Sequence, residues 1–105
     1  MNIDIQSPHF TLHPELNNFV LDKVTKLQHH QSGIISAHVI LKVDKSDTNQ
    51  NKTCEIELKI PGNNLFAKKQ SSTFEEATTL AIDALEHQIQ KRKSSFDKKI
   101  ETDLL

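Results

Sequence analysis

Basic side chains near the ends of two predicted helices are the residues of this chain best suited to do chemistry. The segment 72–99 ends with five cations: Lys91, Arg92, Lys93, Lys98 and Lys99. Ammonium and guanidinium groups neutralise phosphates and donate hydrogen bonds to them, so a cationic helix end can bind a nucleic-acid backbone. The same cations could instead complement the helix dipole, which is worth roughly 0.3–1 kcal/mol each. The cluster by itself leaves both readings open.

A second group of lysines belongs to the helix predicted over residues 14–30. Apolar residues recur there at helical spacing and form one stripe, with Lys23 inside the stripe and Lys26 on its flank. Lys23 could cover the edge of the core with its stem and extend its charge into water, or both lysines could face a polyanion. Lys68 and Lys69, in a short predicted strand, are weaker candidates for the same surface.

Other reactive residue types give little support for catalysis or for a metal site. His9 and His13 precede the helix that would bring them together, and no third ligand lies beside them. Cys54 alternates with apolar residues, which is typical of an inert core thiol. Gly33 and Gly62 are too far apart to form one phosphate-binding loop. We therefore predict no enzyme activity, no metal, no cofactor and no small-molecule substrate.

Six segments must position these side chains, and each shows one apolar face. They are a strand over 2–6, a helix over 14–30, strands over 37–44, 53–60 and 65–70, and a helix over 72–99. The order β-α-β-β-β-α predicts an α+β fold, a two-layer sandwich of a four-stranded sheet with both helices on one face. We expect the long helix to run past the edge of its core.

Composition limits the possible functions. The 105 residues suffice for one domain, placed here at 1–99, with residues 100–105 as a short frayed C-terminal tail. One cysteine excludes an intramolecular disulfide and favours a reducing compartment. No apolar run approaches the ~20 residues of a membrane span, and the N-terminus lacks secretory features, so we expect a cytoplasmic protein with no membrane contact. The formal net charge is −1, so nucleic-acid binding must depend on local charge.

The predicted sandwich separates the charges onto two faces. Cations are expected to converge on the helical side, whereas the open sheet carries the acids Asp4, Asp44, Glu55 and Glu57. A sheet that reads RNA stacks bases on exposed aromatic side chains, and the outward strand positions offer none that can be assigned. We therefore expect the helices to contact RNA phosphates, with little reading of bases.

These residues carry a resemblance to a known family. The segments 66–94 and 10–27 resemble the C-terminal and first helices of the ribosome hibernation promoting factor family, which includes protein Y (ribosome-associated inhibitor A). Residues 38–44 resemble its second strand, and the similarity covers about residues 1–99. The most specific parts are Lys23-x-x-Lys26-Leu27 and Gln88-x-x-Lys91-Arg92-Lys93.

The resemblance implies a fold similar to a double-stranded-RNA-binding domain. It also implies binding to the rRNA (16S-type) of the small ribosomal subunit near the decoding centre, where such proteins occlude mRNA and tRNA in stationary phase or stress. Lys23, Lys26, Lys91, Arg92 and Lys93 would face this rRNA. The chain ends at Leu105 and so resembles the short members, which lack a C-terminal dimerisation domain, and we expect a monomer when free.

Two points argue for weaker binding or for another function. Glu86, His87 and Gln90 stand where the family usually places more basic residues, so fewer phosphate contacts are expected. The alternative function is that of a protein–protein adaptor, which would pair through an exposed strand edge at residues 65–70.

Overall fold

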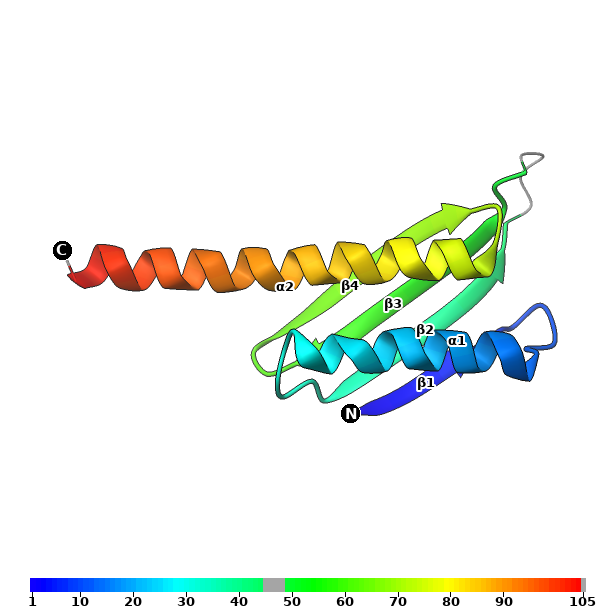
Figure 1. Cartoon of the computed structure of the whole chain (residues 1–105), viewed down its shortest axis with the longest axis horizontal. Coiled ribbons are helices and arrows are strands. Elements are labelled where there is room, and N and C mark those ends of the chain that lie inside the picture. The colour runs from blue at the N-terminus through cyan, green and yellow to red at the C-terminus, as the bar shows by residue number, and fades with distance from the viewer. Residues whose placement is uncertain (45–48, 105) are drawn as a thin grey trace.

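The computed structural model describes residues 1–44 and 49–104, and the side chains of residues 1–44 and 49–92. The elements are β1 (Asn2–Gln6), α1 (Pro14–Thr25), the short 3-10 helix η1 (Lys26–His29), β2 (Ser36–Val43), β3 (Lys52–Ile60), β4 (Asn63–Ser71) and α2 (Phe74–Leu104). Figure 1 shows them in the β-α-β-β-β-α order that the sequence predicted.

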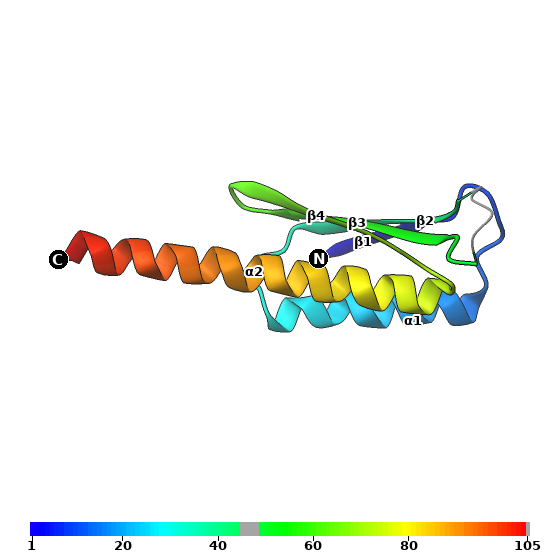
Figure 2. The ribbon, with the colours of Figure 1, turned by 90° about the horizontal axis from the view of Figure 1, so that it is seen from above.

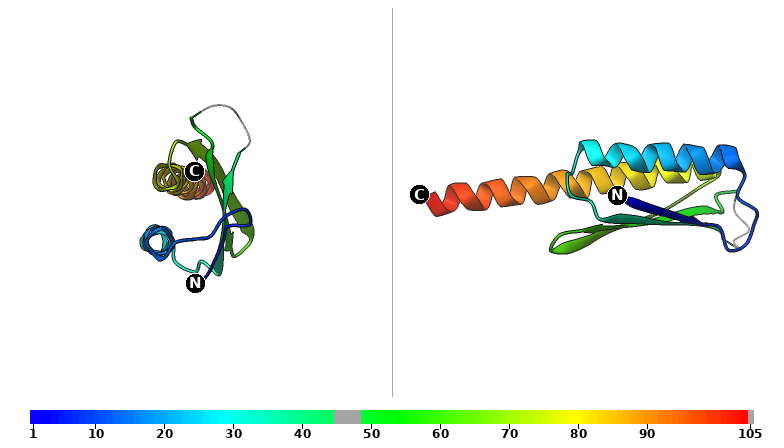
Figure 3. Two further views of the ribbon diagram at one scale, coloured as in Figure 1. Left: turned by 90° about the vertical axis from the view of Figure 1, so that its right-hand side faces the viewer. Right: turned by 90° about the horizontal axis from the view of Figure 1, so that it is seen from below.

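The four strands form one mixed sheet in the order β1-β2-β3-β4. β1 pairs with β2 in parallel, while the β2–β3 and β3–β4 pairs are antiparallel. Both helices cover the same face of this sheet, and the other face is open (Figures 2 and 3). The predicted two-layer α+β sandwich is therefore confirmed.

The core lies between the sheet and the apolar stripes of the helices. Alternation along the strands directs every second side chain toward the helices. The largest fully buried side chains are Val20, Val24, Leu27, Val39, Leu41, Ile56, Leu58, Leu85 and Ile89. Phe10 and Phe74 stack beside this core with their ring centroids 4.8 Å apart. One contiguous core thus fixes the position of both helices.

Local signals start α2 and turn the chain before it. The Thr73 hydroxyl accepts a hydrogen bond from the Glu76 amide at 3.1 Å, as expected for a helix cap. The register pairs Ile60 with Asn63, which leaves Pro61 and Gly62 as a two-residue turn between β3 and β4. Gly62 has φ +84°, a conformation that side chains disfavour, so the Pro-Gly pair suits this turn.

Three elements differ from the predicted bounds by two residues or more at one end. The first helix ends in the 3-10 turn η1 rather than continuing as α-helix to His30. β4 spans nine residues and is longer than the predicted 65–70. α2 continues to Leu104, so residues 100–104 are helical instead of a frayed tail. The reason is that no Gly or Pro follows Gly62 in the sequence to end the helix.

α2 is longer than the sheet that it covers. Its 31 residues span about 46 Å at the rise of an α-helix. The figures show its last turns extending beyond the edge of the sheet (Figures 1 and 3). The prediction that this helix runs past its core is confirmed.

Cys54 is fully buried in β3, as predicted for a core thiol. Burial raises the pKa of this thiol from 9.0 to about 11, and a hydrogen bond with the Thr78 side chain offsets only part of that effect. Because the folded chain holds the proton more tightly than the unfolded chain does, the thiol stabilises the fold below pH 9. That contribution is lost as the pH rises through 11.

Above pH 9, we expect the free energy of unfolding of a Cys54→Ala variant to fall less steeply with pH than that of the unchanged protein. Between pH 9 and pH 11 the free energy of unfolding of the unchanged chain should fall by about 2 kcal/mol more, because its unfolded state ionises first. Urea titrations at several pH values measure both curves. Parallel curves would show that the buried thiol is not linked to folding.

Substitution of Leu85 tests how much the buried face of α2 contributes to stability. Its side chain is 0% exposed, so Leu85→Ala should lower the free energy of unfolding by about 2–5 kcal/mol. Leu80, on the same helix but 39% exposed, supplies the matched control, and Leu80→Ala should change stability by about 0.5 kcal/mol or less. Equal losses in the two variants would contradict the burial pattern described for α2.

Candidate nucleic-acid interface

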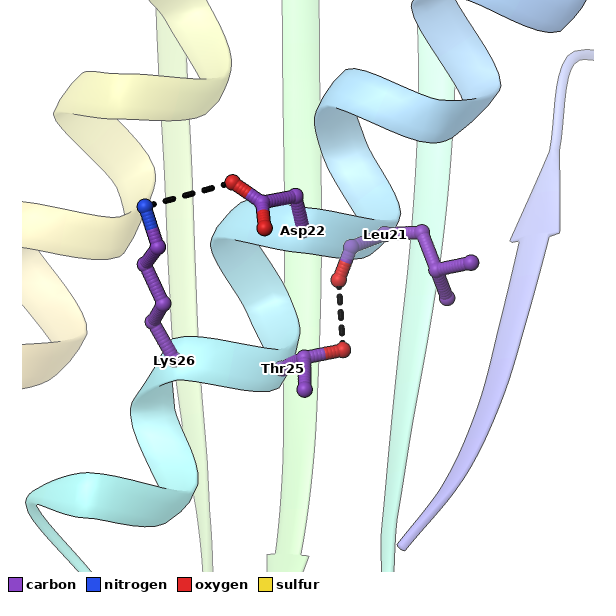
Figure 4. Close-up of polar contacts among 4 residues, drawn as sticks. All are labelled: Leu21, Asp22, Thr25 and Lys26. Carbon is purple, nitrogen blue, oxygen red and sulfur yellow. Dashed lines mark hydrogen bonds and ion pairs between the residues drawn. The ribbon is translucent and has the colours of Figure 1, made fainter.

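Two lysines on the first helix have different surroundings. Lys23 is half-buried, with its Nζ 5.6 Å from the centre of the Phe19 ring, so its stem covers the edge of the core. Lys26 Nζ lies 3.2 Å from Asp22 Oδ2 one turn earlier, and both side chains are mostly exposed, at 57% and 64% (Figure 4). An exposed pair of this kind is worth about 1 kcal/mol or less, so phosphate could replace Asp22 at little cost.

Figure 4 also shows how the end of α1 is held. The Thr25 hydroxyl donates a hydrogen bond to the Leu21 carbonyl at 2.7 Å, within the last turn of the helix. Lys26 then begins η1, and its side chain lies on the side of α1 that faces α2. The Lys26 side chain is thus directed toward the neighbouring helix (Figure 4).

Arg92 and Gln88 attach α2 to the β3–β4 hairpin. Arg92 Nη2 donates to the Pro61 carbonyl at 3.3 Å, and Gln88 Nε2 donates to the Phe66 carbonyl at 2.8 Å. Arg92 therefore has a structural role that the sequence did not suggest, and its remaining N–H groups are available to a ligand. Lys91 beside it is exposed.

Lys23 and Lys91 are offset from each other along the two helices. His30, just after η1, lies 3.4 Å from Glu86 of α2, which identifies the side of α2 that faces the first helix. Lys91 is five residues farther along, about 140° around the helix from Glu86, and so lies on the side away from α1. Lys23 and Lys91 are roughly 20 Å apart along the parallel helices. This offset argues against the predicted convergence of these two residues, and their part in one site stays a prediction.

Lys68 and Lys69 also lie away from the helix ends. Lys68 is paired in register with Glu55 and is on the open face of the sheet. Lys69 is paired with the buried Cys54, so it belongs to the helix-covered face, but about 10 Å along β4 from Phe66 toward the start of α2. The reason is that β4 leads back to the first turn of α2. The side chains of Lys93, Lys98 and Lys99 lie outside the described residues.

The charge predicted for the open sheet face is also wrong. Three lysines, Lys42, Lys59 and Lys68, share this face with the predicted acids, as the strand registers show. Lys42 lies 2.8 Å from Glu55, and His38 lies 2.9 Å from Asp4. Asp44 instead follows the end of β2 and accepts a hydrogen bond from Gln70. The open face is therefore mixed in charge rather than acidic.

An exposed aromatic side chain was missed on the same face. Phe66 is 50% exposed and stands opposite Glu57 in the register. The signal was present in the sequence, because Leu65 and Ala67 point to the core and alternation then turns Phe66 outward.

The described residues lack two further features, a candidate metal site and a candidate membrane span. They contain no group of three or more His, Cys, Asp or Glu side chains that could hold a metal ion. They also contain no helix that is both long enough and apolar enough to cross a membrane.

Comparisons with known proteins agree on one family. The family described as sigma 54 modulation protein / S30EA ribosomal protein matches residues 3–96. Two curated relatives, from Pseudomonas putida KT2440 and from Pseudomonas putida, are each named ribosome hibernation promoting factor. Each is 30% identical to this chain over 93 residues, which are 89% of this chain and 87% of the relative.

Solved structures show the same fold. A ribosomal subunit interface protein from Coxiella burnetii aligns with a TM-score of 0.79 at 23% identity, over 90% of this chain and 99% of its own. The N-terminal domain of Thermus thermophilus protein Y aligns with a TM-score of 0.74 at 23% identity, over 87% and 98%. The resemblance noted in the sequence is thus confirmed, and this chain belongs to the sigma 54 modulation protein / S30EA ribosomal protein family.

Proposed function

We propose that this protein associates with the ribosome and holds it inactive, by binding the rRNA of the small subunit near the decoding centre. The observation that carries this proposal is the 30% identity, over 89% of the chain, to relatives named ribosome hibernation promoting factor. Bound there, the domain excludes mRNA and tRNA, and it acts in stationary phase or under stress. Inhibition by occlusion makes and breaks no covalent bond, so the protein works as a cytoplasmic binding protein and not as an enzyme.

The helical layer supplies suitable contacts for rRNA. Lys23, Lys91 and Arg92 make no ion pair with any described carboxylate, and the partner of Lys26 is easily displaced. Ammonium groups contact phosphates without reading bases, which suits the irregular backbone of folded RNA. Lys93, Lys98 and Lys99 stay in the proposal on the sequence and its family resemblance alone, because their side chains lie outside the described residues. Lys68 and Lys69 are left out because of their positions.

Separated contacts suit a ribosomal partner. Lys23 lies at the core edge of α1, and Lys91 lies on the side of α2 away from α1, so one flat duplex would not reach both readily. A channel wall of folded rRNA surrounds a bound domain and can touch it from two directions. We therefore propose that α1 and the end of α2 contact different parts of the small subunit, and that the domain binds as a monomer.

The adaptor alternative has weaker support. β4 is an edge strand, as pairing with another chain would require. However, this strand carries two lysines. The backbone carbonyl of Phe66, which a pairing strand would need, already accepts a hydrogen bond from the Gln88 side chain. Charged residues and covered backbone groups are devices that prevent edge pairing. These features favour the rRNA proposal.

We expect a Lys23→Gln, Lys91→Gln double variant to bind small subunits about tenfold more weakly, because two phosphate contacts are lost. The slope of log K against log salt should fall in magnitude by about 1.4–1.8. Sedimentation of the protein with purified small subunits, at several salt concentrations, measures both quantities.

A matched control removes the same charge elsewhere. Lys52 contacts the Asn51 side chain, and Lys69 lies toward the start of α2, so a Lys52→Gln, Lys69→Gln double variant should keep the affinity and the slope. Equal weakening by both double variants would mean that only net charge matters, and the proposed surface would be wrong.

Arg92 should also stabilise the β3–β4 turn. Arg92→Gln removes the bond to Pro61, so the amides of Gly62 and Asn63 should exchange with solvent up to about tenfold faster, as expected for one hydrogen bond. Hydrogen exchange followed by NMR measures this rate. Gln90→Ala, at an exposed position two residues away, should leave it unchanged. No difference between the variants would show that the contact with Pro61 does not hold the turn.

A further inference from the structure

The open face of the sheet carries an aromatic side chain between two free lysines. Phe66 is half-exposed on β4 and is paired in register with Glu57 on β3. Lys68 lies two residues beyond Phe66 on β4, and Lys59 lies two residues beyond Glu57 on β3, in the opposite direction along the sheet. In the part of the chain that the structure describes, neither lysine makes an ion pair. No helix covers this face (Figure 2). The aromatic ring and both amines are therefore accessible to the same ligand.

A pocket continues from Lys68 along the same face. It has a volume of about 300 Å³ and is lined by His9, Lys42, Val43, Asp44, Thr53, Lys68 and Gln70. Pockets of this size are at the lower end of those that bind small molecules. Its donors include the amines of Lys42 and Lys68 and the Thr53 hydroxyl, and Asp44 supplies an acceptor. Lys68 therefore borders both Phe66 and the pocket.

These neighbours point to a nucleic-acid strand with unpaired bases. An aromatic ring stacks on a base, a lysine neutralises the phosphate beside it, and polar groups in a pocket hydrogen-bond a second base. Phe66 and Gln70 are about 13 Å apart along the strand, which leaves room for two successive nucleotides. A duplex would hide the base faces, so Phe66 would have no stacking partner.

We propose that the open face binds a short segment of single-stranded RNA, with one base on Phe66, a phosphate at Lys68 and the next base in the pocket. Lys59 lies on the other side of Phe66 and contacts the preceding phosphate, and Glu57 opposite Phe66 accepts from base amino groups. This site goes beyond the contacts proposed for the helices, because it lies on the other face and reads unpaired bases.

Fluorescence anisotropy with a fluorescein-labelled hexauridine RNA, in low salt and without ribosomes, tests the site directly. Phe66→Leu keeps an apolar side chain but removes the ring, and it should raise the dissociation constant about tenfold or more. Lys68→Gln should raise it several-fold. Because Phe66 and Lys68 lie on the open face, the effect of these variants does not depend on the proposed helical contacts.

Each variant has a matched control outside the open face. Lys69→Gln removes the same charge from the next residue of β4, on the other face of the sheet, and should leave the dissociation constant within about twofold. Leu80→Ala changes an exposed apolar residue on α2 and should do the same. Circular dichroism of every variant confirms that the fold is kept.

Three outcomes would overturn the proposal. The first is that the unchanged protein does not bind hexauridine. The second is that Lys69→Gln weakens binding as much as Lys68→Gln does, which would show attraction by net charge alone. The third is that uridine monophosphate competes as well as the hexamer, which would identify a site for free nucleotides and not for a strand.

Discussion

The burial of one face of the sheet is the constraint on which the rest of this structure depends. Ile56 and Leu58 of β3 belong to the same core as Leu85 and Ile89 of α2, and all four side chains are removed from water. At about 25 cal/mol per Å² of apolar surface, contacts of this kind contribute more than any ion pair of the chain. They set the angle and the depth of α2. This packing also determines where the polar side chains of α2 lie.

The positions of the cations follow from where this core ends. Beyond Ile89, α2 has almost no sheet left to cover, and its next inward position is Arg92, whose guanidinium reaches the carbonyl of the hairpin turn. An apolar side chain there would be exposed, whereas arginine satisfies a backbone acceptor and keeps its charge in water. Lys23 stands at the edge of the core on α1, where its amine lies 5.6 Å from the centre of the Phe19 ring. Each of these two cations thus contacts the fold and keeps hydrogen-bond donors for a ligand.

The sequence predicted the fold well because its periodicities were unambiguous. Alternation over β2 and β3 and the helical stripe of α2 each specified one buried face, and covering these faces left a single arrangement of layers. The boundaries of β4 and α2 were less accurate, because local sequence shows a helix end only where a Gly or Pro marks it.

The site was harder to predict than the fold. Residues such as Lys23 and Lys91 could be recognised as cations on helices, but whether they meet depends on the rotation of α2 about its own axis. That rotation is set by tertiary packing, here reported by the contact of Glu86 with His30. Lys68 was misplaced for a simpler reason, since successive residues of a strand point to opposite faces and Lys68 and Lys69 cannot both face the helices. The outward position of Phe66 was open to the same reasoning.

The near-neutral charge of the chain decides how these cations can work. A net charge of −1 provides no long-range attraction to a polyanion, and charges beyond the screening length of about 8–10 Å act independently. Lys23 and Lys91 are farther apart than that, so each must gain its binding free energy from a local phosphate contact.

The geometry of the partner then decides the affinity. A partner that offers phosphates in only one direction would contact one of these cations at a time and bind weakly. A partner that surrounds the domain contacts several cations at once. The second contact then forms at the high effective concentration that the first contact provides. The separation of Lys23 and Lys91 therefore suits a polyanion that surrounds the domain better than one that lies on a single side of it.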